Sequence, residues 1–146
     1  MTKAEEAAAR AAAEAEAAER ARQARIAELR GQLSAVESEI RRFENILRRL
    51  TDARTSMNSY SNSLYSSITV PSISYVLHGA SDWEGVKAVD ADNIKVTVRT
   101  QNTGYESDVK KLLSDIGRGV DNANSRLQSL YNRRNGILGE LRSLGA

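Results

Sequence analysis

Few residues in this chain have the side chains and spacing that catalysis or metal binding requires. His78 is the only histidine and the chain contains no cysteine, so one chain cannot assemble a histidine-based triad or a His–Cys metal site. Asp90 and Asp92 lack the other ligands of a calcium loop. The Gly-Arg-Gly at 117–119 follows no strand and lacks the Lys-Ser/Thr of a phosphate-binding loop. We therefore expect a non-enzyme without a cofactor or metal.

Two arginine pairs, Arg41-Arg42 and Arg48-Arg49, recur seven residues apart and could form a phosphate-binding stripe. The formal net charge is only +2, however, and the acidic residues Glu44 and Asp52 interleave with the arginines. This pattern is more typical of the solvated back of a coiled coil than of a nucleic-acid interface. We expect no nucleic-acid partner.

The only tryptophan, Trp83, lies in a region predicted to be a turn. Pro71, Gly79 and Gly85 punctuate residues 71–85, and Pro71 prevents a preceding helix from continuing unbroken. Exposing an indole ring to water is unfavourable, so Trp83 is expected to pack into the end of the fold or into a partner.

Before this turn, apolar residues recur in alternating steps of three and four, as on one side of a coiled-coil helix. This first seam consists of Ile26, Leu29, Leu33, Val36, Ile40, Phe43, Leu47 and Leu50. The register continues weakly through Met57, Leu64 and Ile68, which predicts a helix from Ile26 to about Ser67.

After the turn, a second seam follows the same rhythm, interrupted only by Arg134. It consists of Val109, Leu113, Ile116, Val120, Ala123, Leu127, Leu130, Ile137, Leu141 and Leu144. Two long heptad helices on either side of a turn predict an all-α fold, a long antiparallel helical hairpin. The single Phe and single Trp agree with burial of aliphatic stripes along extended elements rather than in a globular core.

Three stretches allow two interpretations. Residues 1–25 are Ala-rich and suit either a docking extension or, as we favour, a solvated helical tail before a hairpin domain at 26–146. The Ser-rich residues 55–69 would either admit a closely packed helix or loosen the helix end. Ile94, Val96 and Val98 alternate as in a strand, but a lone strand is marginal, so a helix is favoured.

The apolar stripes are wider than two helices can cover. Leu112, Leu138, Ile46 and Leu50 extend them beyond a strict seam, as in bundles of more than two helices. We therefore expect the seams to bind a partner, either helices of another protein or a second copy in a homodimer.

No stretch approaches the roughly 20 apolar residues that a membrane-spanning helix needs, so stable membrane insertion is not expected. The N-terminal residues Lys3 and Arg10 are not followed by an apolar segment, so no conventional signal peptide is expected either.

The sequence resembles the YwqH-like branch of the WXG superfamily of type VII secretion proteins. Small helical hairpins of this superfamily carry W-x-G in the turn, and in this branch Lys-Ala and an acidic residue commonly follow. The matching residues here are Trp83, Gly85, Lys87, Ala88 and Asp90. The resemblance covers about residues 26–146.

The resemblance implies a small cytoplasmic protein that binds the helical N-terminal domain of an LXG-type toxin and acts as its targeting factor or chaperone. It also implies export by the type VII route without a cleavable signal peptide, with Trp83 and Gly85 in the export-related turn. Some superfamily members carry a Tyr-x-x-x-Asp/Glu signal, but here Tyr105 precedes Val109 and Tyr131 precedes Asn135. A complete signal would then come from the partner.

An alternative interpretation is a coiled-coil chaperone or adaptor resembling prefoldin, in which a β-hairpin connects two helices. The alternation of Ile94, Val96 and Val98 supports it. Such a chain needs strands between residues 69 and 100, whereas helix over residues 86–100 would count against it.

Overall fold

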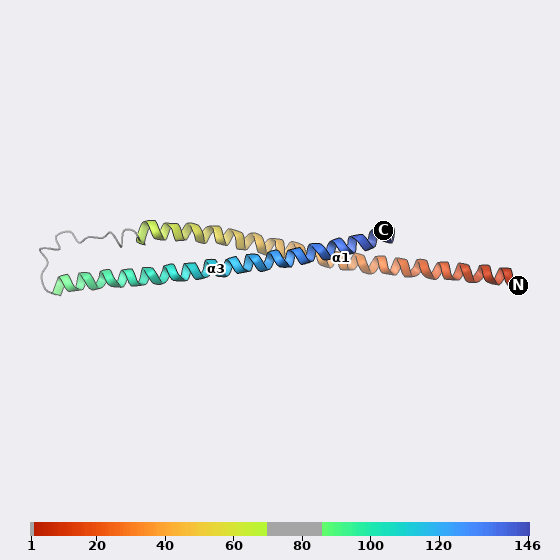
Figure 1. The fold of residues 1–146 in the computed structure, drawn as a ribbon, viewed down its shortest axis with the longest axis horizontal. Helices are drawn as coiled ribbons and strands as arrows, with labels where there is room; N and C mark the ends of the chain where they lie inside the picture. Colours follow the sequence, from red (N-terminus) through yellow and green to blue (C-terminus); the bar gives the residue numbers. More distant parts are fainter. Residues whose placement is uncertain (1, 70–85) are drawn as a thin grey trace. The chain divides into compact units, whose positions relative to one another are not determined.

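The computed structural model describes residues 2–69 and 86–146, and all regular secondary structure within them is helical. Helix α1 spans Lys3–Leu64, the π-helical turn η1 spans Tyr65–Thr69, and helix α3 spans Val86–Ser143. The two long helices pack against each other, as in a helical hairpin (Figure 1). The predicted all-α class is confirmed, while the predicted turn with Trp83 and Gly85 lies outside the described residues.

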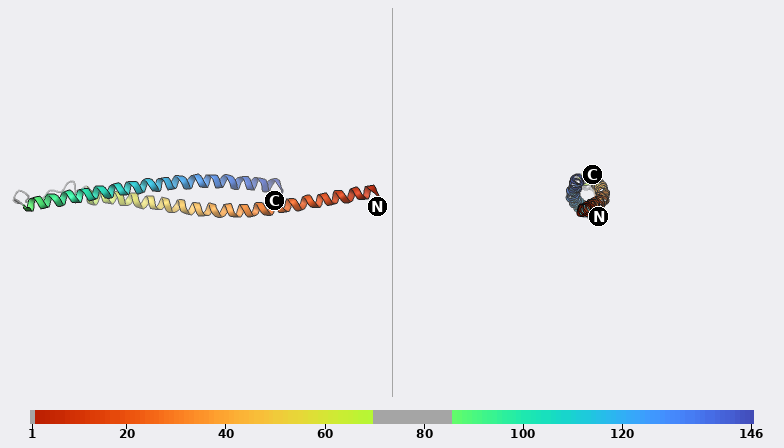
Figure 2. Two further views of the ribbon diagram at one scale, coloured as in Figure 1. Left: turned by 90° about the horizontal axis from the view of Figure 1, so that it is seen from below. Right: turned by 90° about the vertical axis from the view of Figure 1, so that its right-hand side faces the viewer.

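The chain divides into two compact units, each of which pairs a segment of α1 with a segment of α3. Unit 1 comprises Met1–Asn45 and Ala123–Ala146, and unit 2 comprises Ile46–Asn122. Within each unit, the two segments lie side by side in both views (Figures 1 and 2).

Unit 1 buries the first part of the first seam against the last part of the second. Its buried apolar residues are Ile26, Leu29, Val36, Ile40, Ala123, Leu127, Leu130, Ile137 and Leu141. Arg25 contacts Glu140, whereas Glu39 contacts Arg126. Because the residue numbers run in opposite directions along the two segments, the pair is antiparallel, as predicted.

Unit 2 has a less apolar interior. Its buried apolar residues are Leu64, Val109, Ile116 and Val120. Leu47, Leu50, Met57 and Leu113 are half-buried, and Thr69 and Asn102 are buried polar residues. Leu50 lies against Gly119 and Thr69 bonds Asn102, so this pair is antiparallel as well.

The start of α1 and the end of α3 each carry a recognisable cap. At the start of α1, the Thr2 hydroxyl accepts a bond from the Glu5 amide at 3.2 Å, and the Glu5 carboxylate accepts one from the Thr2 amide at 2.7 Å. This reciprocal pair is a capping box. At the end of α3, Gly145 has a φ of 75° and the Ala146 amide bonds the Leu141 carbonyl, which is a Schellman motif.

Residues 86–100 form the first part of α3, so the expected helix at residues 94–98 is confirmed and begins well before the second seam. The strand-like composition is accommodated because threonine hydroxyls bond carbonyls one turn earlier. Thr97 bonds Asn93 at 2.9 Å, and Thr100 bonds Val96 at the same distance.

The Ala-rich residues continue α1 without a break, and residues 3–21 are all exposed. In unit 1 this segment extends past the C-terminus of α3 (Figure 2). Arg22 donates a 2.5 Å bond to the carbonyl of Leu144, the residue that follows α3. That carbonyl belongs to the last turn, whose acceptors lack partners within the helix.

Gly136→Ala is expected to raise the free energy of unfolding by about 0.5–1 kcal/mol, because glycine costs a helix interior roughly that much relative to alanine. A Cβ at Gly136 would meet nothing within 4 Å. The matched control is Gly119→Ala, whose Cβ would lie 3.3 Å from Leu50 Cδ1 and is expected to gain less. Urea unfolding followed by circular dichroism measures both. An equal gain in the two variants would contradict this account of the contact.

A hydrogen-bonded polar group lies in unit 2, and two of its members, Asn102 and Glu106, occupy positions where the coiled-coil rhythm would place apolar side chains. The Asn102 amide nitrogen donates to Thr69 Oγ1 at 2.8 Å, and that hydroxyl donates to the Glu106 carboxylate at 2.6 Å. Asn102 Oδ1 is buried without a hydrogen-bond partner. Thr69 therefore joins both other members of the group.

Thr69→Val is expected to destabilise the protein by about 1–3 kcal/mol, because it leaves the buried Asn102 amide without its acceptor. Thr97→Val is the matched control, since its exposed hydroxyl bonds only the Asn93 carbonyl on its own helix. Thermal unfolding of the two variants makes the comparison. Equal melting temperatures would show that the polar group contributes nothing to stability.

Candidate interaction surface

The structure places most residues of the two predicted seams between α1 and α3 of the same chain. Leu29 is 1% exposed and Leu130 is 2% exposed, both in unit 1. In unit 2, Val109 and Val120 are each 7% exposed. The seams therefore supply the intrachain core, and the exposed surface that remains for a partner must be sought on their flanks.

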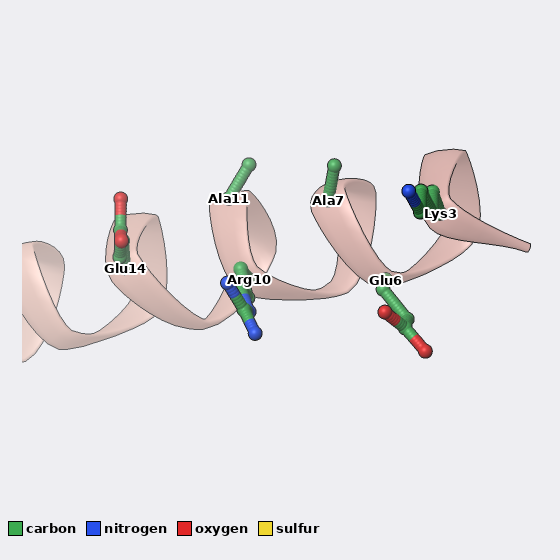
Figure 3. Close-up of a pocket in the computed structure, with 6 residues that line it drawn as sticks. All are labelled: Lys3, Glu6, Ala7, Arg10, Ala11 and Glu14. Carbon is green, nitrogen blue, oxygen red and sulfur yellow. The ribbon is translucent and has the colours of Figure 1, made fainter.

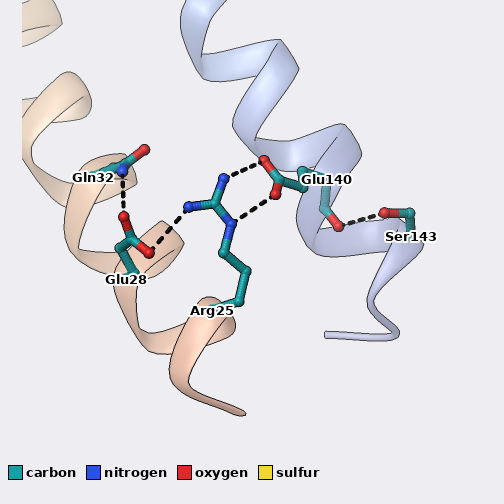
Figure 4. Close-up of polar contacts among 5 residues, drawn as sticks. All are labelled: Arg25, Glu28, Gln32, Glu140 and Ser143. Carbon is teal, nitrogen blue, oxygen red and sulfur yellow. Dashed lines mark hydrogen bonds and ion pairs between the residues drawn. The ribbon is translucent and has the colours of Figure 1, made fainter. Parts of the chain in front are cut away.

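The flanks of unit 1 are charged and bridge the two helices. Arg25 Nε lies 2.8 Å from one Glu140 carboxylate oxygen and Nη2 lies 3.0 Å from the other, a bidentate arrangement (Figure 4). Glu28 accepts a second contact from Arg25 at 3.1 Å and a bond from Gln32 at 3.3 Å. These contacts raise the pKa of Arg25, chiefly through the bond to Glu140.

A second ion pair between the two helices lies beside Phe43, the only phenylalanine of the chain. Arg126 lies 3.0 Å from Glu39, and its guanidinium carbon is 5.9 Å from the centre of the Phe43 ring, within cation–π range. The Tyr131 hydroxyl donates a 2.7 Å bond to Glu44, which raises the pKa of Tyr131. The charged and polar side chains named on these flanks of unit 1 thus bond to one another within the chain.

Arg22 anchors the end of unit 1 and also holds a carboxylate on its own helix. Its guanidinium bonds Glu19 at 2.8 and 2.9 Å, and Gln23 donates a further bond to the same carboxylate. Because the bonds from Arg22 and, to a smaller extent, from Gln23 favour the ionised form, they lower the pKa of Glu19 to about 2. Glu19 keeps its negative charge beside Arg22 over the physiological range.

The flanks of unit 2 are rich in exposed apolar and aromatic side chains. They comprise Tyr60, Tyr65, Val89, Ile94, Val96, Val98, Tyr105 and Leu112, of which each is at least 44% exposed. Six of these eight belong to the first half of α3. Of the four residues predicted to widen the stripes, Leu112 and Leu138 are exposed, whereas Ile46 and Leu50 are half-buried.

The residues predicted to belong to the turn motif are only partly described. Trp83 and Gly85 lie outside the described residues. Lys87 and Ala88 lie in the first turn of α3, and the structure does not describe their side chains. Asp90 is exposed on α3. The grouping of these five residues into one site therefore stays a prediction.

A hollow on α1 has no enclosing wall. Its lining residues are Lys3, Glu6, Ala7, Arg10, Ala11 and Glu14. All six are exposed and lie on consecutive turns of one helix (Figure 3). Within residues 2–69 and 86–146 no three His, Cys, Asp or Glu side chains group as a metal site would require. In the same residues no helix is long and apolar enough to span a bilayer.

A sequence model of the YwqH-like family matches residues 17–142, most of the chain. The chain belongs to the YwqH-like family. The match includes the first seam and all of the second except Leu144, and it omits residues 1–16 of the exposed extension. No curated protein and no solved structure matches the chain. The predicted resemblance to this family is thus confirmed.

Leu130→Ala is expected to destabilise the isolated chain by about 2–5 kcal/mol, because it opens a cavity in the core of unit 1. Leu138→Ala, at an exposed position of the same helix, is expected to change stability by no more than about 0.5 kcal/mol. Chemical unfolding at two protein concentrations measures both effects. If Leu130→Ala were as mild as Leu138→Ala, the seam would not form the intrachain core.

Proposed function

We propose that this protein is a small, non-catalytic helical partner of an LXG-type toxin secreted by the type VII route. It acts as a targeting factor or chaperone, and it binds the helical N-terminal domain of the toxin in a helix bundle. The proposal joins membership of the YwqH-like family to the resemblance of this sequence to the WXG superfamily, which rests on Trp83, Gly85 and the residues that follow them.

The observation that carries the proposal is the exposure of apolar side chains on α3. Ile94 and Tyr105 are 65% and 61% exposed, although they lie on the same helix as the buried Val109 and Ile116. Several exposed apolar side chains on one helix typically mark a protein–protein interface. A further helix that covered them would convert the two-helix pair into the bundle that the sequence predicts.

The proposal assigns export to the complex. The Trp83–Gly85 turn would belong to the export-related end of the complex, as it does in the superfamily that the sequence resembles. Since no tyrosine here precedes an acidic residue by four positions, the toxin would contribute any signal of that type. The chain would be made in the cytoplasm and would accompany the toxin to the export machinery.

The helix over residues 86–100 counts against the prefoldin-like alternative. That alternative required strands between residues 69 and 100, whereas Ile94, Val96 and Val98 belong to helix α3. These three side chains lie on the surface of a helix and form no strand.

The proposal is tested by measuring the mass of the full chain by light scattering, with and without co-expression of an LXG-type N-terminal domain. We expect a stoichiometric complex, and we expect Trp83→Ala to weaken it. The control is Ser38→Ala, at an exposed position of unit 1 outside both seams, which should leave the complex intact. A homo-oligomer that does not bind the toxin domain would refute the proposal that this toxin is the partner of the chain.

A further inference from the structure

Equivalent positions of the two units carry different chemistry. In unit 1, Glu39 lies three residues after the buried Val36, and Arg126 lies three residues after the buried Ala123. Glu39 and Arg126 meet at 3.0 Å across the helix pair. Val36 and Ala123 are seam positions that are followed by a step of four to the next seam position. Residues three positions after such a seam position therefore line one flank of the antiparallel pair, where in unit 1 they form ion pairs.

In unit 2 the same positions on α3 are apolar. Tyr105 lies three residues after the buried Asn102, and Leu112 lies three residues after the buried Val109. Val98 precedes Tyr105 by seven residues and so shares its side of the helix. These three side chains are 61%, 45% and 44% exposed, respectively.

Helix α1 adds an aromatic side chain to the same flank, and α3 adds an isoleucine. Tyr60 lies three residues after the half-buried Met57, the offset that defines this flank in unit 1. Ile94 precedes Val98 by four residues, which places it on the adjacent outer position. We call this set the Tyr105 flank: Tyr60, Ile94, Val98, Tyr105 and Leu112.

The Tyr105 flank is longer than the apolar part of the opposite flank. On the opposite side of α3, Val89 and Val96 are exposed, but the next residues at seven-residue spacing are Thr103 and Lys110. The Tyr105 flank instead carries apolar or aromatic side chains at three successive positions of seven-residue spacing, Val98, Tyr105 and Leu112. It therefore offers the longer stripe to a docking helix.

The borders of the Tyr105 flank define the chemistry of its occupant. On α1 the outer positions near Tyr60 are Ser56 and Ser63, small residues that let another helix approach closely. On α3 the outer positions after Ile94 are Gln101, Asp108 and Asp115, spaced by seven. Two of these three are acidic and none is basic, although Arg118 pairs with Asp115.

We propose that the Tyr105 flank docks an amphipathic helix of another protein whose apolar stripe is bordered by lysine or arginine. Basic residues there would complement Asp108 and Asp115, and the stripe would cover the exposed aliphatic and aromatic side chains. A second copy of this chain would bring the same acidic border against itself, so it fits less well. This inference rests on the proposed function and names the surface and the partner chemistry that it uses.

The test uses the full chain and two labelled peptides of about 28 residues, which correspond to four heptads. Both peptides carry the same leucine and isoleucine stripe, bordered by lysine in one and by glutamate in the other. Fluorescence anisotropy measures their binding to the chain. We expect the lysine-bordered peptide to bind at least about ten-fold more tightly. Equal binding, or a preference for the glutamate-bordered peptide, would overturn the proposed chemistry.

Two exposed valines on opposite flanks of α3 provide matched variants that test where the peptide binds. Val98→Gln alters the Tyr105 flank and is expected to weaken the lysine-bordered peptide about ten-fold. Val96→Gln makes the same exchange on the opposite flank and should leave binding unchanged. Both positions are exposed, and circular dichroism with thermal unfolding verifies that both variants fold. An equal loss in both variants, or a homodimer that Val98→Gln dissociates, would overturn the inference.

Binding of the toxin domain to the same variants distinguishes a failure of this inference from a failure of the proposed function. A complex with the LXG-type N-terminal domain that survives both Val98→Gln and Tyr105→Ser would sustain the function and refute the Tyr105 flank. Selective binding of the lysine-bordered peptide without any toxin complex would sustain the flank and refute the toxin assignment.

Discussion

The fold depends on the burial of one aliphatic stripe from each of two long helices. A helix pair can exclude water from a single seam only, so every side chain beside that seam stays at least partly in solvent. Leu29 and Leu130 show how complete the exclusion is within unit 1. What the protein can bind is therefore decided by the residues that border the seam. These borders are charged and bridged in unit 1 but largely apolar and exposed in unit 2.

Much of this architecture follows from spacing alone. The three-four rhythm from Ile26 to Leu50 and from Val109 to Leu144 predicted both the helices and the buried positions, because a heptad seam leaves little choice of which side is buried. The capping box of Thr2 and Glu5 and the C-terminal motif at Gly145 were not predicted, because the pattern of apolar residues does not reveal them.

Other features required the relative placement of the two helices. The local composition of residues 94–98 favours a strand, and a helix was expected there only because a lone strand is marginal. The continuity of α3 through these residues overrides their local preference. The ion pairs of Arg25 with Glu140 and of Arg126 with Glu39 depend on the register of distant segments. The same holds for the polar group of Thr69 and Asn102, whose members are 33 residues apart. The Trp83 turn stays a prediction from the sequence.

The exposed first part of α1 has a consequence for how the chain folds. Its alanines bury nothing, so they gain no stability from packing, yet they continue a helix that the paired segment has already started. Nucleation is the costly step in helix formation, whereas adding residues to an existing helix is nearly neutral or favourable for alanine. The helix of this extension therefore depends on the paired turn at Arg22 and Arg25, from which it propagates. Its helicity reports on the integrity of that turn, although residues 3–21 are all exposed.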